Sequence, residues 1–155
     1  MRLRVFTNIN PTKSRVRVTT DPFDVLAPQL AMSAGLSDVA RQACSPFRTW
    51  QRRFVRLARA VGIPLRDRSP YDRFMLRFHD HLKTNQAFQD GCAKYRWEFP
   101  PNATWPALTD MVPHAALSGQ HALEQTLIVS QDVLLLPQKA PVHVLERLAE
   151  TSLTN

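Results

Sequence analysis

Residues 105–129 hold two short runs of alternating apolar and polar side chains, and this stretch constrains the fold more than any other part of the sequence. A short segment, Ser118-Gly119-Gln120-His121, separates the runs, and glycine tolerates the positive φ that tight turns require. We therefore predict a β-hairpin of two short strands joined by a tight connection, the second strand over residues 122–129. Because side chains of an extended chain alternate between faces, Glu124 and Gln125 point to opposite faces of that strand.

His114 stands at the start of the first of these strands, directly after a proline. A histidine in this place, followed by a polar group such as Gln125 on the next strand, resembles the downstream half of the iron and 2-oxoglutarate centre of jelly-roll oxygenases. Non-haem Fe(II) in such centres binds two histidines and one carboxylate. His114 is therefore a candidate metal ligand, and Gln125 a candidate for binding 2-oxoglutarate. A histidine with a structural hydrogen bond is the alternative, and the spacing alone does not decide between them.

Residues 3–9 alternate equally regularly, with Arg4, Phe6 and Asn8 on one face. The pattern predicts a β-strand with one wet face. In a jelly roll the inward face of such a strand can line the cofactor pocket, which makes Arg4 and Asn8 further candidates for binding 2-oxoglutarate. A surface edge strand with solvated polar side chains is the alternative.

Prolines mark the starts of the predicted helices. Pro22, Pro46 and Pro70 precede runs that predict helices to about residues 32, 61 and 84, so residues 22–85 are expected to form a helical insert. Pro141 begins a last helix that reaches about residue 151. Sheet strands are expected over residues 2–19 and 95–129.

Positive charge is concentrated in the middle third of the chain. The sequence has a net charge of +7, and residues 41–83 alone carry 11 basic and 3 acidic side chains, which is 11 − 3 = +8. On the helix predicted for residues 46–61, one sector is entirely basic. Its members are Arg48, Arg52, Arg53, Arg56 and Arg59. The sector is either an ordinary solvated helix face or a surface for an anionic partner, such as lipid phosphates or nucleic acid.

The sequence His79-Asp80-His81 looks like a metal motif but falls within the helix predicted for residues 70–84. Residues two apart on a helix point about 200° apart, so His79 and His81 do not chelate one ion together. A structural role for these histidines is the interpretation that we prefer.

No apolar run approaches the roughly 20 residues of a membrane span, and no secretory signal follows Met1. Cys44 and Cys92 are far apart and have no second cysteine nearby, so both are expected to be free thiols. A cytoplasmic location is therefore expected, with peripheral association at the inner membrane left open.

Three longer segments, residues 3–11, 69–83 and 109–126, together resemble the Kdo hydroxylase family and follow one another in the family's order. That resemblance implies an Fe(II)/2-oxoglutarate-dependent dioxygenase of Gram-negative bacteria. Its substrate would be the sugar Kdo in the lipopolysaccharide inner core, carried on Kdo-lipid A. The basic sector of residues 48–59 would then face a phosphorylated glycolipid and the anionic inner leaflet, and no sequence-specific nucleic acid partner is expected.

The family's His-x-Asp pair is expected upstream of the segment that resembles residues 3–11. We therefore expect residues 1–155 to be the C-terminal portion of a jelly-roll oxygenase and to have little activity alone. The expected fold is α+β, a single domain in which a partial jelly-roll (double-stranded β-helix) sheet is flanked by helices. The alternative function is a non-catalytic basic module that binds anionic lipid or nucleic acid. The oligomeric state and the group that binds 2-oxoglutarate are left open.

Overall fold

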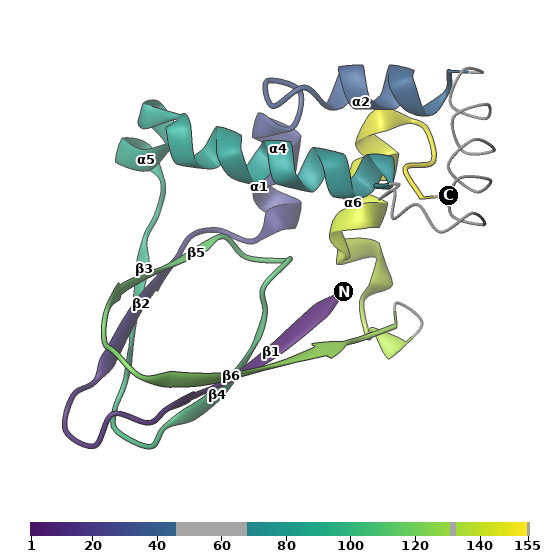
Figure 1. The fold of residues 1–155 in the computed structure, drawn as a ribbon. Helices are drawn as coiled ribbons and strands as arrows, with labels where there is room; N and C mark the ends of the chain where they lie inside the picture. The colour runs from purple at the N-terminus through teal and green to yellow at the C-terminus, as the bar shows by residue number, and fades with distance from the viewer. Residues whose placement is uncertain (46–67, 131–132, 155) are drawn as a thin grey trace, which may run out of the picture. The chain divides into compact units, whose positions relative to one another are not determined.

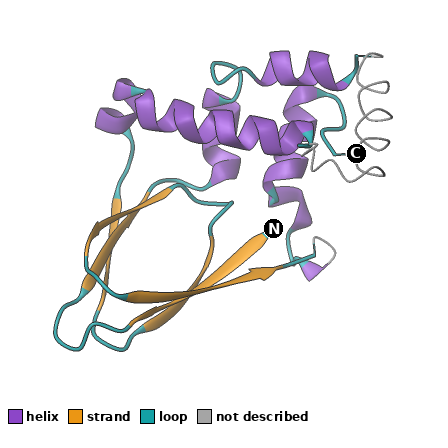
Figure 2. Ribbon diagram, in the orientation of Figure 1, coloured by secondary structure: helices purple, strands orange, loops and turns teal. Residues whose placement is uncertain are grey.

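The computed structural model describes residues 1–45, 68–130 and 133–154 (Figure 1). By its internal contacts the chain divides into two compact units. One unit combines Met1–Leu26 with Gln86–Pro141, and the other combines Ala27–Asn85 with Val142–Asn155. The first contains every strand of the described residues, and the second is built of helices (Figure 2). The mixed helix and sheet class expected from the sequence is thus confirmed.

Two antiparallel three-stranded sheets make up the strand unit. In the first sheet, β1 (Arg2–Asn8) lies between β4 (Thr104–Leu108) and β6 (Ala122–Ile128). In the second, β2 (Arg15–Thr19) lies between β3 (Tyr95–Phe99) and β5 (His114–Ser118). Consecutive strands β1 and β2, β3 and β4, and β5 and β6 therefore belong to different sheets. Each sheet is assembled from residues that are far apart in the sequence.

The connection at residues 118–121 contains two residues with positive φ, but it does not close a hairpin. β5 pairs with β2 and β6 pairs with β1, so the chain crosses here from one sheet to the other. Gly119 has φ 103° and His121 has φ 63°. A Cβ atom on Gly119 would lie 2.7 Å from Cα of Arg15, a distance that side chains do not tolerate. The turn residues were recognisable in the sequence, whereas the predicted pairing of the two strands was wrong because each strand has its partner elsewhere in the chain.

The face of β1 that carries Arg4, Phe6 and Asn8 points toward the other sheet instead of into water. Phe6 is buried and stacks on Trp105 with ring centroids 5.5 Å apart, and Trp105 stacks on Phe99 of the other sheet at 3.7 Å. The prediction of a wet face was therefore wrong for Phe6 and Asn8, and the alternative of an edge strand was wrong because β1 is central. Pro106 lies in the edge strand β4, as predicted for a residue without a backbone donor.

Among the described residues, three helices lie within the predicted helical insert of residues 22–85, and a fourth begins directly after it. α1 (Phe23–Leu30) is shorter than predicted, and Gly35, at φ 88°, allows the chain to turn into the unpredicted α2 (Leu36–Ala43). α4 (Pro70–Thr84) is the predicted third helix, and its N-cap Ser69 accepts a hydrogen bond of 3.0 Å from the Asp72 N–H. α5 (Gln86–Gly91) was not predicted. The predicted helix over residues 46–61 lies outside the described residues.

The C-terminal part of the chain ends in an anchored segment. The short 3-10 turn η2 (Pro137–Lys139) precedes α6 (Pro141–Ala149). Beyond α6, the side chain of Leu153 is fully buried, and its carbonyl accepts a hydrogen bond from the Tyr71 N–H at 3.2 Å. Within the helical unit, the Phe74 and Phe78 rings of α4 stack 5.6 Å apart as part of the core.

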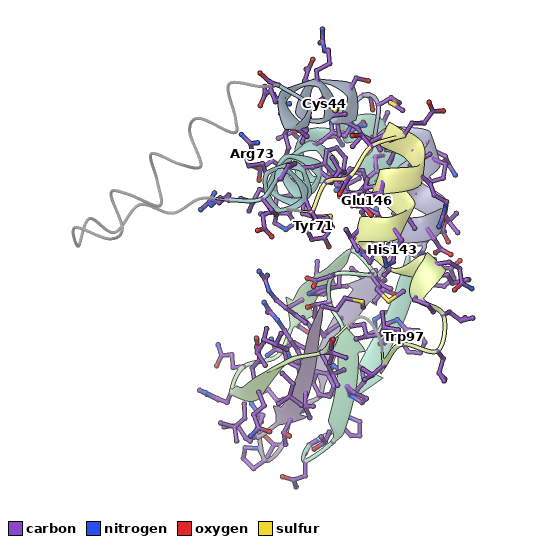
Figure 3. All side chains as sticks on the ribbon, turned by 90° about the vertical axis from the view of Figure 1, so that its right-hand side faces the viewer. Cys44, Tyr71, Arg73, Trp97, His143 and Glu146 are labelled. Carbon is purple, nitrogen blue, oxygen red and sulfur yellow. The ribbon has the colours of Figure 1, made fainter. Side chains whose placement is uncertain are left out.

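One carboxylate of α6, Glu146, binds this terminal segment (Figure 3). Its Oε1 accepts hydrogen bonds from the main-chain N–H of Leu153 at 2.9 Å and of Thr154 at 3.3 Å. The hydroxyls of Ser152 and Thr154 donate to the same oxygen at 3.1 and 3.2 Å. Partial burial raises the pKa of Glu146, but these hydrogen bonds to the ionised form outweigh it, so the net pKa lies below the ordinary value of 4.5.

The Glu146→Gln substitution is expected to lower the free energy of unfolding by about 1 kcal/mol at neutral pH, because the charged acceptor is lost. A lowered folded-state pKa stabilises the fold above the unfolded value near 4.5, and this contribution fades as the pH falls through the lowered pKa. The difference between variant and wild type should therefore shrink in acid. Urea unfolding followed by circular dichroism at neutral and acid pH measures it.

Glu150→Gln is the matched control, since Glu150 is exposed and follows the same helix. It should leave the unfolding free energy unchanged at both pH values. A Glu146→Gln effect of the same size in acid as at neutral pH would contradict the assigned hydrogen bonds.

Candidate functional site

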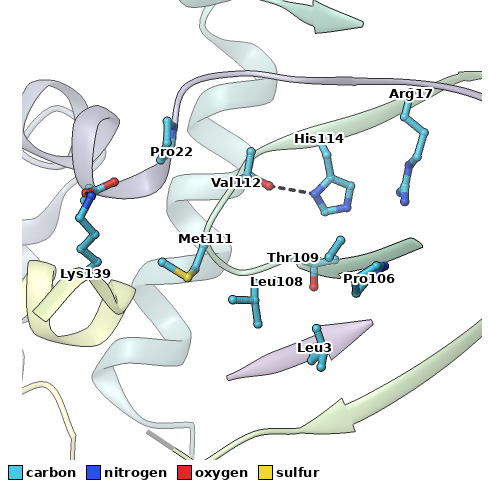
Figure 4. Close-up of a pocket in the computed structure, with 12 residues that line it drawn as sticks. Leu3, Arg17, Pro22, Pro106, Leu108, Thr109, Met111, Val112, His114 and Lys139 are labelled. Atoms are coloured by element: carbon cyan, nitrogen blue, oxygen red, sulfur yellow. Dashed lines mark hydrogen bonds and ion pairs between the residues drawn. The ribbon is translucent and has the colours of Figure 1, made fainter. Parts of the chain in front are cut away.

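A cavity of about 630 Å³ opens in the strand unit beside His114 (Figure 4). Its wall is mostly apolar, with a few polar groups, which is the usual character of a small-molecule site. The apolar part is formed by Leu3, Pro22, Pro106, Leu108, Met111 and Val112. The charged or titratable part consists of Arg17, Asp24, His114 and Lys139, of which Lys139 and Asp24 form an ion pair at 3.2 Å. Arg17 and His114 are therefore the cavity's two groups without such an ion-pair partner among the described residues.

His114 is the first residue of β5, and its ring is held by a local hydrogen bond. Nδ1 lies 2.9 Å from the carbonyl oxygen of Val112 (Figure 4). Because a carbonyl only accepts, Nδ1 carries the proton in this bond, and the neutral ring keeps its lone pair on Nε2. A metal-binding histidine typically donates its other ring N–H to a carbonyl in this way. Asp110, four residues before His114, accepts a hydrogen bond from the Arg2 N–H at 2.9 Å.

Arg17 is a site residue that the sequence analysis missed. Its guanidinium lies 4.3 Å from the centroid of the Phe6 ring, and its side chain borders the cavity with His114. Burial lowers the pKa of Arg17 most, the positive charges of Arg15 and Arg4 lower it further, and Glu124 alone raises it. The signal in the sequence was the pair of arginines that alternate with valines in residues 15–18.

Positive charge exceeds negative charge in this interior. Three guanidinium groups, those of Arg4, Arg15 and Arg17, share the neighbourhood with the one carboxylate of Glu124, which is +3 − 1 = +2. Arg4 takes that carboxylate in an ion pair of 2.9 Å. The Nε atom of each of the three arginines is buried and lacks a hydrogen-bond partner. The cluster therefore has donors and charge available for an anion.

The three residues predicted to bind 2-oxoglutarate have three different surroundings in the structure. Arg4 belongs to the arginine cluster just described. Asn8 is 0% exposed, and its amide nitrogen donates to the carbonyls of Lys13, Phe99 and Pro100 while its oxygen accepts from the Asn10 N–H. Gln125 is paired with Val5, so it lies on the other face of the sheet from Glu124 and Arg4.

Among the described residues, no three or more His, Cys, Asp or Glu side chains come together as a metal ion requires. On α4, His81 Nε2 lies 3.2 Å from Ser33 Oγ, and His79 Nδ1 lies 3.8 Å from Asp80 Oδ1. The described chain thus offers one imidazole that fits a metal site and does not complete an iron centre by itself. The predicted basic sector, Arg48, Arg52, Arg53, Arg56 and Arg59, lies outside the described residues. No described helix combines the length and apolar character of a membrane span.

Comparison with known proteins assigns the chain to one family. The family profile described as 3-deoxy-D-manno-oct-2-ulosonic acid (Kdo) hydroxylase matches residues 1–152. The chain belongs to this family, and the resemblance noted in the sequence is confirmed. No curated protein sequence matches the chain significantly.

Crystal structures of the Kdo hydroxylase KdoO, a non-heme Fe(II) alphaketoglutarate-dependent dioxygenase, are similar to this chain. One contains alphaketoglutarate and Fe(III), and another contains succinate and Fe(III). Each matches with a TM-score of 0.78 and 32% identity over 99% of this chain and 48% of that chain. The present chain therefore spans about half the length of these solved relatives.

The hydrogen bond from His114 to Val112 predicts which ring nitrogen is protonated. In the neutral ring, His114 should carry its proton on Nδ1. Long-range proton–nitrogen NMR spectra identify the tautomer, and the His114→Gln variant assigns the signal. A His114 ring protonated on Nε2 would contradict the assigned bond and remove the free nitrogen from the cavity.

Proposed function

We propose that this chain forms part of an Fe(II)- and 2-oxoglutarate-dependent dioxygenase that hydroxylates Kdo in the lipopolysaccharide inner core, on Kdo-lipid A. The family match and the likeness to KdoO support the reaction class. The observation that carries the proposal is the placement of His114 and Arg17 on one cavity wall, with the Nε2 lone pair of His114 free. One group suits a metal and the other suits a carboxylate.

The six strands are proposed to be six of the eight strands of a jelly roll. The strands form two antiparallel sheets, and the chain passes from one sheet to the other between β1 and β2, β3 and β4, β4 and β5, and β5 and β6. β5 and β6 are edge strands, and nearly all of their residues are exposed. Exposed apolar side chains mark these edges, namely Leu117, Leu123, Leu127 and Ile128. Two further strands, from polypeptide outside residues 1–155, would cover them because bare edges and apolar patches are unfavourable.

A strand added beside β5 would also lie next to His114. His114 Nε2 would then be one ligand of the iron, and a second histidine and a carboxylate would come from the added polypeptide. When bound, the iron supplies the O₂-dependent oxidation that is coupled to decarboxylation of 2-oxoglutarate. The residues of this chain orient one ligand, through the His114–Val112 bond, and supply the mostly apolar wall that limits water in the cavity.

Arg17 is proposed to bind a carboxylate of 2-oxoglutarate. A guanidinium offers paired N–H donors that match the two oxygens of a carboxylate. Arg4 is the weaker candidate because its guanidinium already forms an ion pair with Glu124. The Asn8 side chain already forms hydrogen bonds with main-chain groups. Gln125, on the opposite face, is proposed to have no part in binding the cofactor. A dicarboxylate would neutralise the positive charge of the arginine cluster.

Arg17→Gln is expected to weaken 2-oxoglutarate binding about 10- to 100-fold, because a charged hydrogen-bond partner is removed. Calorimetric titration of 2-oxoglutarate into residues 1–155 measures the effect. Arg96→Gln is the matched control, since Arg96 is an exposed arginine of β3 that pairs with Glu98 and is absent from the cavity wall. It should bind as the wild type does. Equal affinities of wild type and Arg17→Gln would remove Arg17 from the site.

Residues 1–155 alone are expected to release little succinate from 2-oxoglutarate with Fe(II) and Kdo-lipid A. One imidazole does not hold ferrous iron tightly when the described residues provide no further cluster of ligands. The assay compares this chain with a full-length relative of the KdoO kind. Succinate release at a comparable rate would show that the ligands are complete within these residues.

The membrane association and the substrate's lipid part rest on charge alone. The net charge of +7 suits a phosphorylated glycolipid and the anionic inner leaflet, so a cytoplasmic enzyme that acts at the inner membrane is proposed. The second candidate function, a non-catalytic basic module for anionic lipid or nucleic acid, depends on the same charge. The cavity with His114 and Arg17 favours the enzyme, because a purely electrostatic module needs no such cavity.

A further inference from the structure

The sheet face that carries His114 also carries two aromatic side chains. In the second sheet, Thr19 of β2 is paired with Tyr95 on one side and with His114 on the other. Arg17 is paired in the same way with Trp97 and Ala116. Residues directly opposite each other on neighbouring strands project to the same face. Tyr95 and Trp97 therefore project from the same face as Arg17 and His114.

These two rings are unusually open for aromatic side chains in a sheet. Trp97 is 52% exposed and Tyr95 is 49% exposed. Phe99, the next residue of β3 on this face, is instead covered by Trp105, with ring centroids 3.7 Å apart. Of the three aromatic residues on this face of β3, Phe99 packs against Trp105, whereas Trp97 and Tyr95 are about half exposed.

Hydrogen bonds hold the polar edges of both rings. Trp97 Nε1–H donates to Thr19 Oγ1 at 2.9 Å, and the Tyr95 hydroxyl donates to Asp21 Oδ1 at 3.1 Å. The hydrogen bond and the negative charge of Asp21 raise the pKa of the Tyr95 hydroxyl, so it remains a donor at neutral pH. Both rings are fixed at one edge while their faces stay in contact with solvent. Figure 3 shows Trp97 on the strand unit.

A sugar ring suits such a surface. One face of a pyranose is a patch of C–H groups that packs against an aromatic ring, while its hydroxyls remain free for hydrogen bonds. An acidic sugar adds a carboxylate, which the positive charge of the arginine cluster attracts. Neighbouring strands lie about 4.8 Å apart, so two strand spacings, roughly 10 Å, separate Tyr95 from His114. That span accommodates one monosaccharide.

We propose that Trp97, with Tyr95 beside it, is the platform on which the ring of an acidic sugar substrate stacks next to His114. The proposal rests on the proposed function, because it names how that reaction's sugar is held. Trp97 would determine specificity through the ring face, and Thr19 would position it through the indole N–H.

Titration of the free monosaccharide Kdo into residues 1–155, followed by NMR of the indole N–H signals, tests this. The Trp97 signal, assigned by its loss in Trp97→Phe, is expected to shift with Kdo. Trp97→Ala should weaken Kdo binding about tenfold, Trp97→Phe should keep most of the affinity because a ring remains, and Thr19→Val should give an intermediate loss. Mannose, which lacks the carboxylate, should bind more weakly than Kdo to the wild type.

Calorimetric titration of 2-oxoglutarate into the same variants separates the two proposals. Retained 2-oxoglutarate affinity in Trp97→Ala, with Kdo affinity lost, supports the platform and shows that the variant is folded. Unchanged Kdo affinity in Trp97→Ala, or a wild type that binds 2-oxoglutarate but not Kdo, overturns the platform and leaves the cofactor site standing. A Trp97 signal that shifts with protein concentration instead of with Kdo would show that a second copy of the chain binds this face. That result also overturns the platform.

Discussion

The contact between the two sheets depends on a short row of stacked groups. Trp105 lies between Phe6 of its own sheet and Phe99 of the other, and the guanidinium of Arg17 covers the Phe6 ring from the second sheet. Rings stacked in this way bury a large apolar area and fix their relative orientation. Because Arg17 is part of the row, the interaction that joins the sheets also sets the direction of the cavity's cationic side chain. Packing and site geometry are therefore coupled at one residue.

The same interior holds charges that a structural core would avoid. Removing a guanidinium from water is costly, and a single carboxylate, that of Glu124, offsets only part of the charge of Arg4, Arg15 and Arg17. The ring of Phe6 compensates in part through its contact with Arg17. What remains is an excess of positive charge beside an apolar cavity. Such a combination suits a dicarboxylate ligand.

The structural match with KdoO covers 99% of this chain and 48% of the KdoO chain. The exposed edges β5 and β6 are where added strands can pair, and β5 begins with His114. Within the helical unit, Leu153 and Glu146 anchor the terminal residues. The two units thus have separate sources of stability, an aromatic stack in one and a capped helical core in the other.

Local patterns in the sequence determined much of the secondary structure. Alternation identified the strands near residues 3–9 and 122–129, Pro70 marked the start of α4, and Gly119 marked a turn, since each depends on backbone preferences of a few adjacent residues. His114 was found because a histidine at a strand start is visible without any fold. The family was recognisable from longer segments for the same reason, because these keep their order along the chain.

Only the tertiary structure decided which strands pair and which faces meet. The connection at Gly119 looked like a hairpin, yet the residues of β5 and β6 pair with residues at least 114 − 19 = 95 positions away, in β2 and β1. Long-range pairing depends on packing between distant segments, which neighbouring residues do not encode. Register placed Arg17 beside the cavity and Gln125 on the other face of its sheet from Arg4. A shift by one residue exchanges the two faces of a strand, so no local pattern could have assigned those roles.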